Sequence, residues 1–271
     1  MNDKYIVVTG AAGGIGSHVC TTLADSGYAI FALDKNDIGI SKRYKGSIIP
    51  VKVDFDSIAS INEAAKYIKS QTSQLHGIIN IAGIFDQFPL MEVDHDRFNQ
   101  LINTNFVAHH HLTRMLFPLL HEAKGRIINL SSETVLSPMP LQSYAFSKKL
   151  FEAWSDQLKI ELELLGIKVI KIRAGGHKTP FIDISLEVLS KYDSNSLYSN
   201  LYEKIKSKGS SMLKNVKNDP LVVAQVIQRA LKEKNPSHLY HVNVSVLFRV
   251  LSMLPQSIRE MLMIWQLKKW M

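Results

Sequence analysis

Apolar runs rich in isoleucine and valine recur along the first two thirds of the chain and lack polar alternation. Such runs are typical of strands buried on both faces of a parallel sheet. The runs lie at 5–9, 28–33, 47–53, 77–82, 125–132 and 167–172. Between them, apolar residues at helical spacing predict helices at 14–26, 58–74, 97–122 and 143–165. This alternation predicts an α/β fold: a Rossmann-type, doubly wound parallel sheet with helices on both faces.

Two segments depart from this alternation. Residues 178–218 follow the sixth predicted strand without a further βα unit, and residues 246–271 form an apolar, basic tail. The chain shows no internal repeat, low-complexity tract or domain linker. We therefore expect one Rossmann-type domain over residues 1–245, followed by the tail.

The composition is that of a soluble globular protein: of 271 residues, 46% are hydrophobic and 21% are charged. Cys20 is the one cysteine, so no internal disulfide can form. A reducing compartment is the natural location of such a chain, and we expect a cytoplasmic protein. The first apolar run is too short for a secretory signal peptide and is better explained as a strand.

Positive charge is concentrated toward the C-terminus. The net charge is +8, and residues 178–271 hold 14 Lys and Arg against 7 Asp and Glu, a balance of +7. Nucleic acid or an anionic membrane surface would attract such a region. The sequence contains neither zinc-finger spacing nor an RNA-binding signature, so we expect no nucleic-acid partner.

The segment VVTGAAGGIGSHV joins the first predicted strand to the first predicted helix. Gly10 can make the tight turn after the strand, and Gly14 and Gly16, which flank Ile15, let the backbone approach a phosphate. The first N–H groups of the helix then face a pyrophosphate. The spacing G-x-x-x-G-x-G differs from the G-x-G-x-x-G of longer dehydrogenases. We predict a dinucleotide-binding loop here.

Asp34 ends the second predicted strand. A carboxylate at this place can accept hydrogen bonds from both ribose hydroxyls of an adenosine and repels a 2′-phosphate. The glycine loop has no Lys or Arg to offset that repulsion, and Lys35 is the one ambiguous neighbour. We therefore expect NAD as the cofactor, with NADP less favoured. Asp54, after the third predicted strand, is a weaker candidate for an adenine contact.

Five motifs follow one another along the chain: TGAAGGIG (9–16), NIAG (80–83), NTN ending at Asn105, INLSS (128–132) and YAFSK (144–148). With these motifs the chain resembles the short-chain dehydrogenase/reductase superfamily, in its single-domain branch, over roughly residues 4–180. The resemblance implies a Rossmann-type sheet and a nicotinamide cofactor. Each motif alone is loose, but five in this order are highly specific.

The resemblance also implies the roles of particular residues. It implies a catalytic tetrad of Asn105, Ser132, Tyr144 and Lys148, in which Ser131 is a rival for the place of Ser132. It implies cofactor contacts at Asn80, Ala82, Gly83, Tyr144, Lys148 and Thr179. The family usually shows Pro-Gly after the sixth strand, where this chain has Ala174-Gly175, so the shape of that loop stays open.

Tyr144 and Lys148 are four residues apart and share one face of the predicted helix. A free phenol has a pKa of about 10, but a neighbouring ammonium and an oxidised nicotinamide both favour the phenolate. Tyr144 can then take a proton from an alcohol while hydride leaves for the cofactor, and return it in the reverse reaction. Ser132 can hold the substrate oxygen. By resemblance, Asn105 bends its helix and holds a water that connects Lys148 to solvent.

These residues predict an NAD(P)-dependent oxidoreductase that interconverts a secondary alcohol and a ketone. Two alternatives stay open: a non-catalytic dinucleotide-binding sensor or scaffold, and a sugar-nucleotide epimerase or dehydratase, which shares Tyr-x-x-x-Lys. Residues 178–218, where the family places its substrate lid, are dense in apolar side chains. That density favours a small apolar substrate, lipid-like, steroid-like or with an acyl chain, although ordinary helix packing would produce it too.

Three other features suggest no chemistry. The consecutive histidines 109–111 diverge by about 100° on a helix and cannot chelate one ion, so we expect no metal. Cys20, on the first predicted helix, is better explained as a core residue than as a reactive thiol. His177 is better explained as a loop residue without a cofactor contact.

The tail combines Trp265 and Trp270 with Lys268 and Lys269, a pairing expected at a lipid headgroup boundary. Charged residues and Pro255 interrupt the segment, so it cannot be a membrane-spanning helix. Its apolar residues do not fall on one helical side, which favours partial burial against protein. We expect the tail to make either a peripheral membrane contact or a subunit contact, in a homo-oligomer that is a dimer or tetramer.

Overall fold

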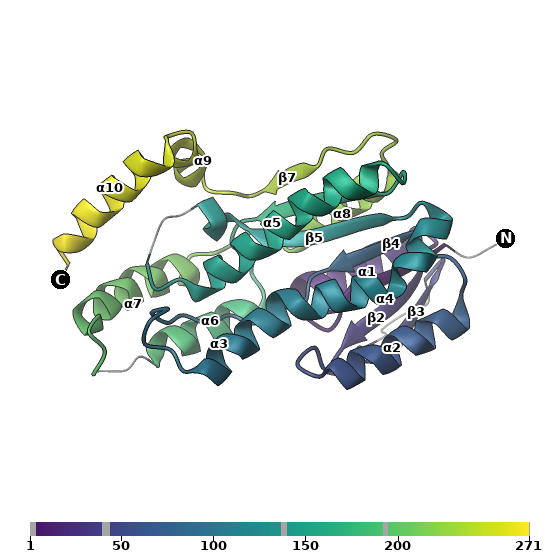
Figure 1. Cartoon of the computed structure of the whole chain (residues 1–271), viewed down its shortest axis with the longest axis horizontal. Coiled ribbons are helices and arrows are strands. Elements are labelled where there is room, and N and C mark those ends of the chain that lie inside the picture. The colour runs from purple at the N-terminus through teal and green to yellow at the C-terminus, as the bar shows by residue number, and fades with distance from the viewer. Residues whose placement is uncertain (1–3, 40–43, 137–139, 192–194, 271) are drawn as a thin grey trace.

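A computed structural model describes residues 4–39, 44–136, 140–191 and 195–270 (Figure 1). Within these ranges seven strands form one sheet, in the order β3-β2-β1-β4-β5-β6-β7, and every neighbouring pair is parallel. The strands are β1 (Tyr5–Thr9), β2 (Ala29–Asp34), β3 (Ser47–Lys52), β4 (Gly77–Asn80), β5 (Arg126–Ser132), β6 (Lys168–Ala174) and β7 (Leu239–Val242). The strand order reverses between β1 and β4, and ligands of doubly wound sheets bind at the carboxyl ends of the strands beside such a reversal.

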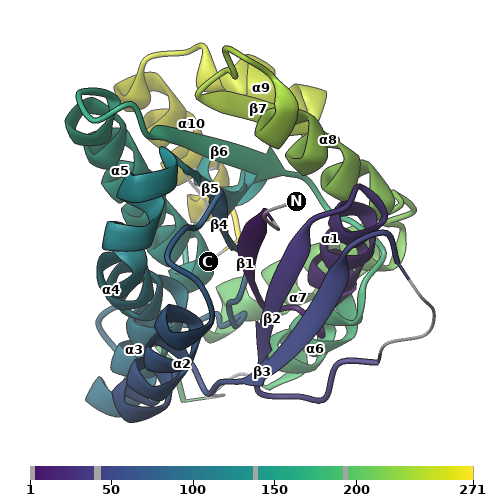
Figure 2. The ribbon, with the colours of Figure 1, turned by 90° about the vertical axis from the view of Figure 1, so that its right-hand side faces the viewer.

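Helices cover both faces of this sheet (Figure 2). They are α1 (Gly14–Asp25), α2 (Ile58–Gln71), α3 (His95–Ile102), α4 (Ala108–Ala123), α5 (Ser143–Glu163), α6 (Pro180–Ser190), α7 (Ser199–Lys214), α8 (Leu221–Lys232), α9 (Val246–Ser252) and α10 (Gln256–Lys268). Helices α1 and α8 pack on one face, and α2, α4 and the end of α5 pack on the other. The predicted Rossmann-type sheet with helices on both faces is confirmed.

The core explains why the strand sequences lack polar alternation. Along β1, Ile6 and Val8 point into the cluster beneath α1 and α8, whereas Val7 points into the cluster beneath α2 and α4. All three side chains are fully buried. Burial of one such side chain contributes about 1.5–3 kcal/mol, so a polar residue on either face would be costly. Successive apolar residues are therefore required in a strand that is covered on both faces.

The six predicted strands are confirmed, and their ends differ from prediction by two residues at most. Strand β7 was not predicted, because it is four residues long and lies at the sheet edge, where its side chains are not all buried. The segment predicted as one helix over 97–122 is helical throughout, but it is not a single α-helix. A π-helical segment, η1 (Asn103–Val107), separates α3 from α4, and the side-chain contacts of Asn105 stabilise this interruption.

The segment predicted as a lid contains α6 and α7, and the tail contains α9 and α10 (Figure 1). Leu189 of α6 and Leu201, Tyr202 and Ile205 of α7 form a small buried cluster, against which Trp270 of the tail packs. A short 3-10 helix, η2 (Glu133–Leu136), follows β5 in the segment that leads to α5. In the part of the chain that the structure describes, no helix combines the length and apolarity that crossing a membrane requires.

Candidate active site

The glycine loop begins at the carboxyl end of β1. Gly10 has a φ of +68°, a left-handed conformation that L side chains rarely adopt, and a Cβ there would approach the backbone nitrogen of Ala82 to 2.9 Å. A Cβ on Gly16 would lie 2.0 Å from the carbonyl oxygen of Gly10. Both positions therefore require glycine, because the turn and the start of α1 are in direct contact.

The start of α1 suits an anionic ligand. The residue that precedes the helix, Gly13, has no side chain that could cap it, and the first turn of the helix contains no acidic residue. The first N–H groups of α1, including those of Gly14 and Ile15, are thus available to a pyrophosphate. Thr179 lies over the loop, since a Cβ added to Gly14 would be 2.5 Å from Thr179 Cβ. The structure therefore brings the loop and Thr179 together.

Asp34 lies at the carboxyl end of β2 and is only 8% exposed. One of its carboxylate oxygens accepts from Ala12 N–H at 3.0 Å and the other from Asn36 N–H at 2.9 Å. Both oxygens keep a second lone pair, so the orientation fits the acceptance of two ribose hydroxyls. Asp54 is exposed beyond the end of β3, and its carboxylate accepts from Asp56 N–H at 3.0 Å.

Asn105 is fully buried in the π-helical segment and connects the loop after β4 to α5. Its Oδ1 accepts from Ile84 N–H at 2.8 Å, and its Nδ2 donates to the Ile84 carbonyl at 3.0 Å. The same Nδ2 donates to Ser147 Oγ at 2.9 Å, and Ser147 Oγ in turn donates to the Tyr144 carbonyl at 2.7 Å. Asn105 therefore fixes the first turn of α5, which carries Tyr144.

Ser132, Tyr144 and Lys148 meet at the carboxyl end of β5. The Ser132 hydroxyl oxygen accepts from Thr134 N–H at 3.2 Å and from its hydroxyl at 3.0 Å, and it is hydrogen-bonded to the Tyr144 phenol. Lys148 is 3% exposed, and its Nζ donates to the Leu130 carbonyl at 3.0 Å. That Nζ lies 5.8 Å from the centre of the Tyr144 ring.

The pKa of Tyr144 is raised above its ordinary value, whereas the sequence predicted that Lys148 would lower it. Burial is the dominant effect and raises the pKa of Tyr144, while the hydrogen bond to Ser132 acts in the opposite direction. Burial also lowers the pKa of Lys148 to about 8, against the attraction of the Glu152 carboxylate. In the protein alone, the buried phenol therefore holds its proton and Lys148 is mostly charged at neutral pH.

Ser131 and Ser132 are separated by their partners. Ser131 is buried, and its hydroxyl donates to Glu152 at 2.6 Å. Glu152 also pairs with Arg173 at 2.6 Å and lies 3.6 Å from Lys171, and these contacts hold the pKa of Glu152 low against the effect of burial. The sequence analysis missed this buried ion pair, because its members come from α5 and β6. The geometry favours Ser132 over Ser131 beside Tyr144.

Sequence reasoning also missed the role of His109. Its side chain is fully buried, with Nε2 2.8 Å from the Ala82 carbonyl and Nδ1 3.2 Å from Asn80 Oδ1. Burial lowers the pKa of His109 to about 3, so the ring is neutral. Asn80 Nδ2 further donates to Asn129 at 2.8 Å. A neutral ring carries one N–H and can donate to only one of the Ala82 and Asn80 oxygens, so the shorter contact ties Ala82 to α4. The place of His109 on the helical face of Leu112 and Leu116 was the available signal.

Other sequence features have structural surroundings. Cys20 is 1% exposed within the core, and burial raises the pKa of its thiol to about 12. His177 is buried after β6, with its Nδ1 2.9 Å from the Gly175 carbonyl and its Nε2 3.2 Å from Asn243. Gly83 packs on the tetrad, since a Cβ there would be 3.1 Å from Asn105 Oδ1. Among the described residues, no three His, Cys, Asp or Glu side chains are grouped as a metal site would require.

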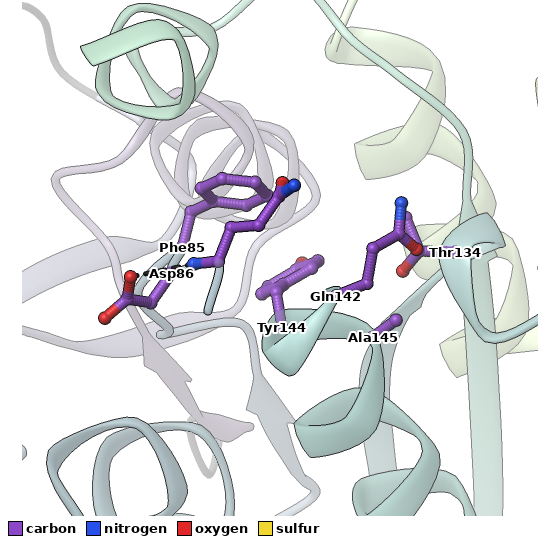
Figure 3. A pocket seen from close by; sticks show the side chains of 7 residues that line it. Phe85, Asp86, Thr134, Gln142, Tyr144 and Ala145 are labelled. Atoms are coloured by element: carbon purple, nitrogen blue, oxygen red, sulfur yellow. Dashed lines mark hydrogen bonds between the residues drawn. The ribbon is translucent and has the colours of Figure 1, made fainter. Parts of the chain in front are cut away.

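A small cavity lies over Tyr144 (Figure 3). It is lined by Phe85, Asp86, Gln87, Thr134, Gln142, Tyr144 and Ala145, and its volume is about 20 Å³. Phe181 of α6 packs against both Phe85 and Tyr144, with ring centres 6.0 Å and 5.7 Å apart. The cavity has room for about one water.

Comparison with known proteins agrees with this geometry. A family model described as short chain dehydrogenase matches residues 4–186. The uncharacterized oxidoreductase YbbO of Escherichia coli K12 is 34% identical over 184 residues, which cover 67% of this chain and 68% of the relative. Retinol dehydrogenase 7 of Mus musculus is 27% identical over 98% of this chain and 89% of its own length. A solved short-chain dehydrogenase from Streptomyces avermitilis shares the fold, with a TM-score of 0.77 at 19% identity over 99% of this chain and 98% of that one. The chain therefore belongs to the short-chain dehydrogenase family of oxidoreductases.

Proposed function

We propose that this protein is an NAD-dependent oxidoreductase that interconverts a secondary alcohol and a ketone. The observation that carries the proposal is the group of side chains around Tyr144. Ser132 is hydrogen-bonded to the phenol, and Lys148 places a buried ammonium 5.8 Å from the ring. Asn105 anchors the turn of α5 that carries both Tyr144 and Ser147. This is the arrangement that proton transfer at a substrate oxygen requires.

The chain's own residues would handle the proton. In the oxidation direction, Tyr144 first releases its own proton to solvent; Ser132 then holds the substrate hydroxyl against the phenolate, which takes the substrate proton. The positive charge of Lys148 favours the phenolate as that proton arrives and leaves. A bound nicotinamide dinucleotide supplies the hydride acceptor, or the hydride donor in the reverse direction. In reduction, Tyr144 gives its proton to the ketone oxygen.

The residues after β1 and β2 support NAD over NADP. Asp34 offers a buried carboxylate where the adenosine ribose would lie, and a 2′-phosphate would meet that charge at close range. The glycine loop, with Gly10, Gly14, Ile15 and Gly16, contains no cation to offset it. Asn80, Ala82 and Gly83 would line the nicotinamide half, with Thr179 above them. Asp54 is a further candidate for the adenine end.

An apolar substrate is supported by the walls of the site. Phe85 and Phe181 stack around the Tyr144 ring, and the lid cluster of α6 and α7 continues this apolar surface. Apolar walls favour a ligand that buries hydrocarbon, such as a lipid-like, steroid-like or acyl-chain molecule. The name of the mouse relative, retinol dehydrogenase 7, refers to a substrate of that class.

We also propose that residues 1–245 are the catalytic domain, that 178–218 are its lid and that 246–271 are a separate docking tail. A homo-oligomer, dimer or tetramer, is supported by the outer face of α5. On that face Phe146 is 41% exposed, Ile160 67% and Leu164 86%. These residues recur on one side of the helix, which suits contact with a second helix.

A cytoplasmic location is proposed from the single buried thiol of Cys20. A peripheral membrane contact of the tail is proposed from its exposed apolar and basic side chains. Met261 and Trp265 of α10 are each 62% exposed, and Lys269 Nζ lies 3.3 Å from the centre of the Trp265 ring. Exposed tryptophan beside lysine suits the headgroup region of an anionic bilayer.

A nicotinamide absorbance assay tests the proposed function. The full-length protein is incubated with NAD⁺, NADP⁺, NADH or NADPH and a panel of secondary alcohols and ketones of increasing chain length. We expect substrate-dependent change in absorbance with NAD(H). Tight cofactor binding without turnover of any alcohol or ketone would instead support a sensor or scaffold. Conversion of sugar nucleotides with no net change in absorbance would support an epimerase or dehydratase.

A further inference from the structure

Gln87 has a buried side-chain amide that lacks a partner. The residue lines the cavity over Tyr144 and is 6% exposed. Its Nε2 has no hydrogen-bond acceptor among the residues the structure describes. Its backbone, in contrast, is firmly held: Gln87 N–H donates to Asp86 Oδ1 at 2.7 Å, and the Tyr202 hydroxyl donates to the Gln87 carbonyl at 3.5 Å.

An unpartnered buried amide is costly. Leaving a buried donor unsatisfied costs about 1–3 kcal/mol, and native proteins keep few such groups. The other polar groups that line the cavity do not take this donor. The Asp86 carboxylate is paired with Arg97, the Thr134 hydroxyl donates to Ser132, and the Gln142 amide lines the same cavity without accepting from Gln87. The cavity has room for about one oxygen atom, so the donor is placed to bond an oxygen that enters it.

We propose that Gln87 forms a polar subsite in the substrate pocket, where its amide donates a hydrogen bond to a second oxygen of the substrate. The substrate class is thereby narrowed to an apolar molecule that carries, besides the reacting alcohol or ketone, a carbonyl, hydroxyl or ether oxygen as an acceptor. This inference rests on the proposed function, because it assumes that the substrate lies over Tyr144.

The subsite would set both specificity and orientation. Phe85 and Phe181 provide apolar contact but cannot distinguish one end of a long molecule from the other. A single donor at Gln87 adds that distinction, since the substrate must place its second oxygen there while its reacting oxygen meets Ser132 and Tyr144. A site built to bond a substrate oxygen discriminates strongly against analogues that lack it.

The stability of the free protein gives a test that does not depend on activity. Gln87→Met removes the unpartnered donor and keeps the volume, so we expect the Tm to stay level or to rise by roughly 2–4 °C. Gln157→Met, at an exposed position of α5, is the control for the residue change and should leave the Tm unchanged. A fall of several degrees for Gln87→Met alone would mean that the amide has a structural partner, and would overturn the proposal.

Substrate selectivity gives the second test. Each matched pair consists of a long-chain secondary alcohol and a keto-alcohol of the same chain length. The keto-alcohol differs from its partner only by carrying a second oxygen, at a position that varies from pair to pair. We expect wild-type kcat/KM to favour one keto-alcohol by about tenfold, and Gln87→Met to remove that preference while it retains turnover of the plain alcohol. NAD⁺-dependent thermal shifts with the same pairs give the same comparison without turnover.

The outcomes separate the two proposals. If both members of every pair are oxidised equally by wild type and by Gln87→Met, the subsite is wrong and the proposed function stands. If no alcohol or ketone is turned over, the proposed function fails. In that case, a keto-alcohol that raises the Tm of wild type more than the Tm of Gln87→Met would support the subsite. Equal shifts of the two Tm values would overturn it.

Discussion

At Tyr144, two influences oppose each other. Burial raises the pKa of the phenol and the Ser132 hydroxyl lowers it, while the ammonium of Lys148 lies 5.8 Å from the ring centre. Because burial dominates in the protein alone, the phenol keeps its proton until a ligand brings further positive charge. The residue is therefore suited to give a proton to a ketone and to take one back from an alcohol.

Tyr144→Phe should abolish turnover, because Tyr144 is the proposed proton donor and acceptor. General acid–base catalysis contributes about 10²–10⁴-fold, so we expect kcat to fall by at least about a hundredfold. Cofactor affinity, measured by fluorescence titration of NADH, should change little. Tyr240→Phe, which removes a hydroxyl bonded to Glu233 near β7, is the matched control and should keep its activity. Activity of Tyr144→Phe within tenfold of wild type would contradict the assignment.

Asp34 should set the choice of dinucleotide. We expect wild-type kcat/KM to be higher for NADH than for NADPH, because the buried carboxylate repels a 2′-phosphate. Asp34→Ala should narrow the difference, mainly by raising KM for NADH. Asp25→Ala, at an exposed position on α1, controls for the loss of one negative charge. Wild-type preference for NADPH would refute this prediction and point to Lys35.

The buried His109 should make stability depend on pH. Its folded pKa is about 3 against an ordinary 6.5, so below pH 6.5 the unfolded chain binds a proton that the folded protein excludes. The contribution of neutral His109 to the free energy of unfolding is therefore complete above pH 6.5, and it is lost as the pH falls toward 3. Between pH 6.5 and 5 the loss should be about 2 kcal/mol.

Urea unfolding at a series of pH values measures this loss. His109→Gln keeps a donor for the Ala82 carbonyl but cannot titrate, so its free energy of unfolding should vary less over the same range. His110→Gln, one residue along on the exposed side of the helix, is the control and should retain the wild-type slope. A His109→Gln variant with an unchanged slope would show that another group takes up the proton.

At the scale of elements, the π-helical segment η1 connects two parts of the site. It interrupts the helix between α3 and α4, and it turns the side chain of Asn105 toward the loop at Ile84. The lid elements α6 and α7 are connected to the same region through Phe181, which touches the Tyr144 ring. The catalytic turn of α5 is therefore held from one side by η1 and covered from the other by the lid.

The lid should select long apolar substrates. Each methylene that becomes buried against the lid contributes about 0.8 kcal/mol, so kcat/KM should rise with chain length until the pocket is filled. Phe181→Ala should flatten this dependence, because it removes an aromatic wall beside Tyr144. Leu197→Ala, in the exposed segment before α7, is the control. Higher kcat/KM for short hydrophilic alcohols than for long-chain ones would count against an apolar substrate.

At the scale of the whole molecule, the tail stands out as an exposed apolar surface. Its large exposed side chains are Val246, Leu247, Val250, Met253, Leu254, Ile258, Met261, Leu262, Ile264 and Trp265. Only one side of α10 is covered: Leu267 and Trp270 pack toward the α7 cluster, and Lys208 lies over the Trp270 ring. The segment has four basic residues and one acidic residue, so an anionic lipid surface complements it better than neutral lipid.

Flotation with liposomes tests the membrane contact. Full-length protein should float with vesicles that contain anionic lipid and should remain at the bottom with neutral vesicles. Trp265→Ser should weaken flotation by removing an interfacial anchor, and the double substitution Lys268→Glu with Lys269→Glu should weaken it by reversing local charge. Gln157→Met, distant from the tail in sequence, is the control. Failure of wild type to float with anionic vesicles would direct attention to a subunit interface.

The alternation of strands and helices follows from local sequence. A strand covered on both faces must be apolar throughout. The turn that places residue 10 against Ala82 requires glycine at that position. Both constraints are visible in local sequence. The residues proposed for the site could also be named from local sequence, because they occur in short motifs. The edge strand β7 was not predicted, because a strand of four residues with incomplete burial leaves only a weak hydrophobic pattern.

The neighbours of each of these residues depend on how distant segments of the chain pack together. The choice between Ser131 and Ser132 depends on Glu152, which comes from another element. The sequence suggested no chemistry for His109, and folding gives it a structural place by burying it against Ala82. The pKa of Tyr144 moved against expectation, because desolvation depends on every surrounding element and not on the four-residue spacing to Lys148. Local spacing specifies which side chains share a helix face, whereas burial, charge and hydrogen-bond partners arise only when distant segments pack together.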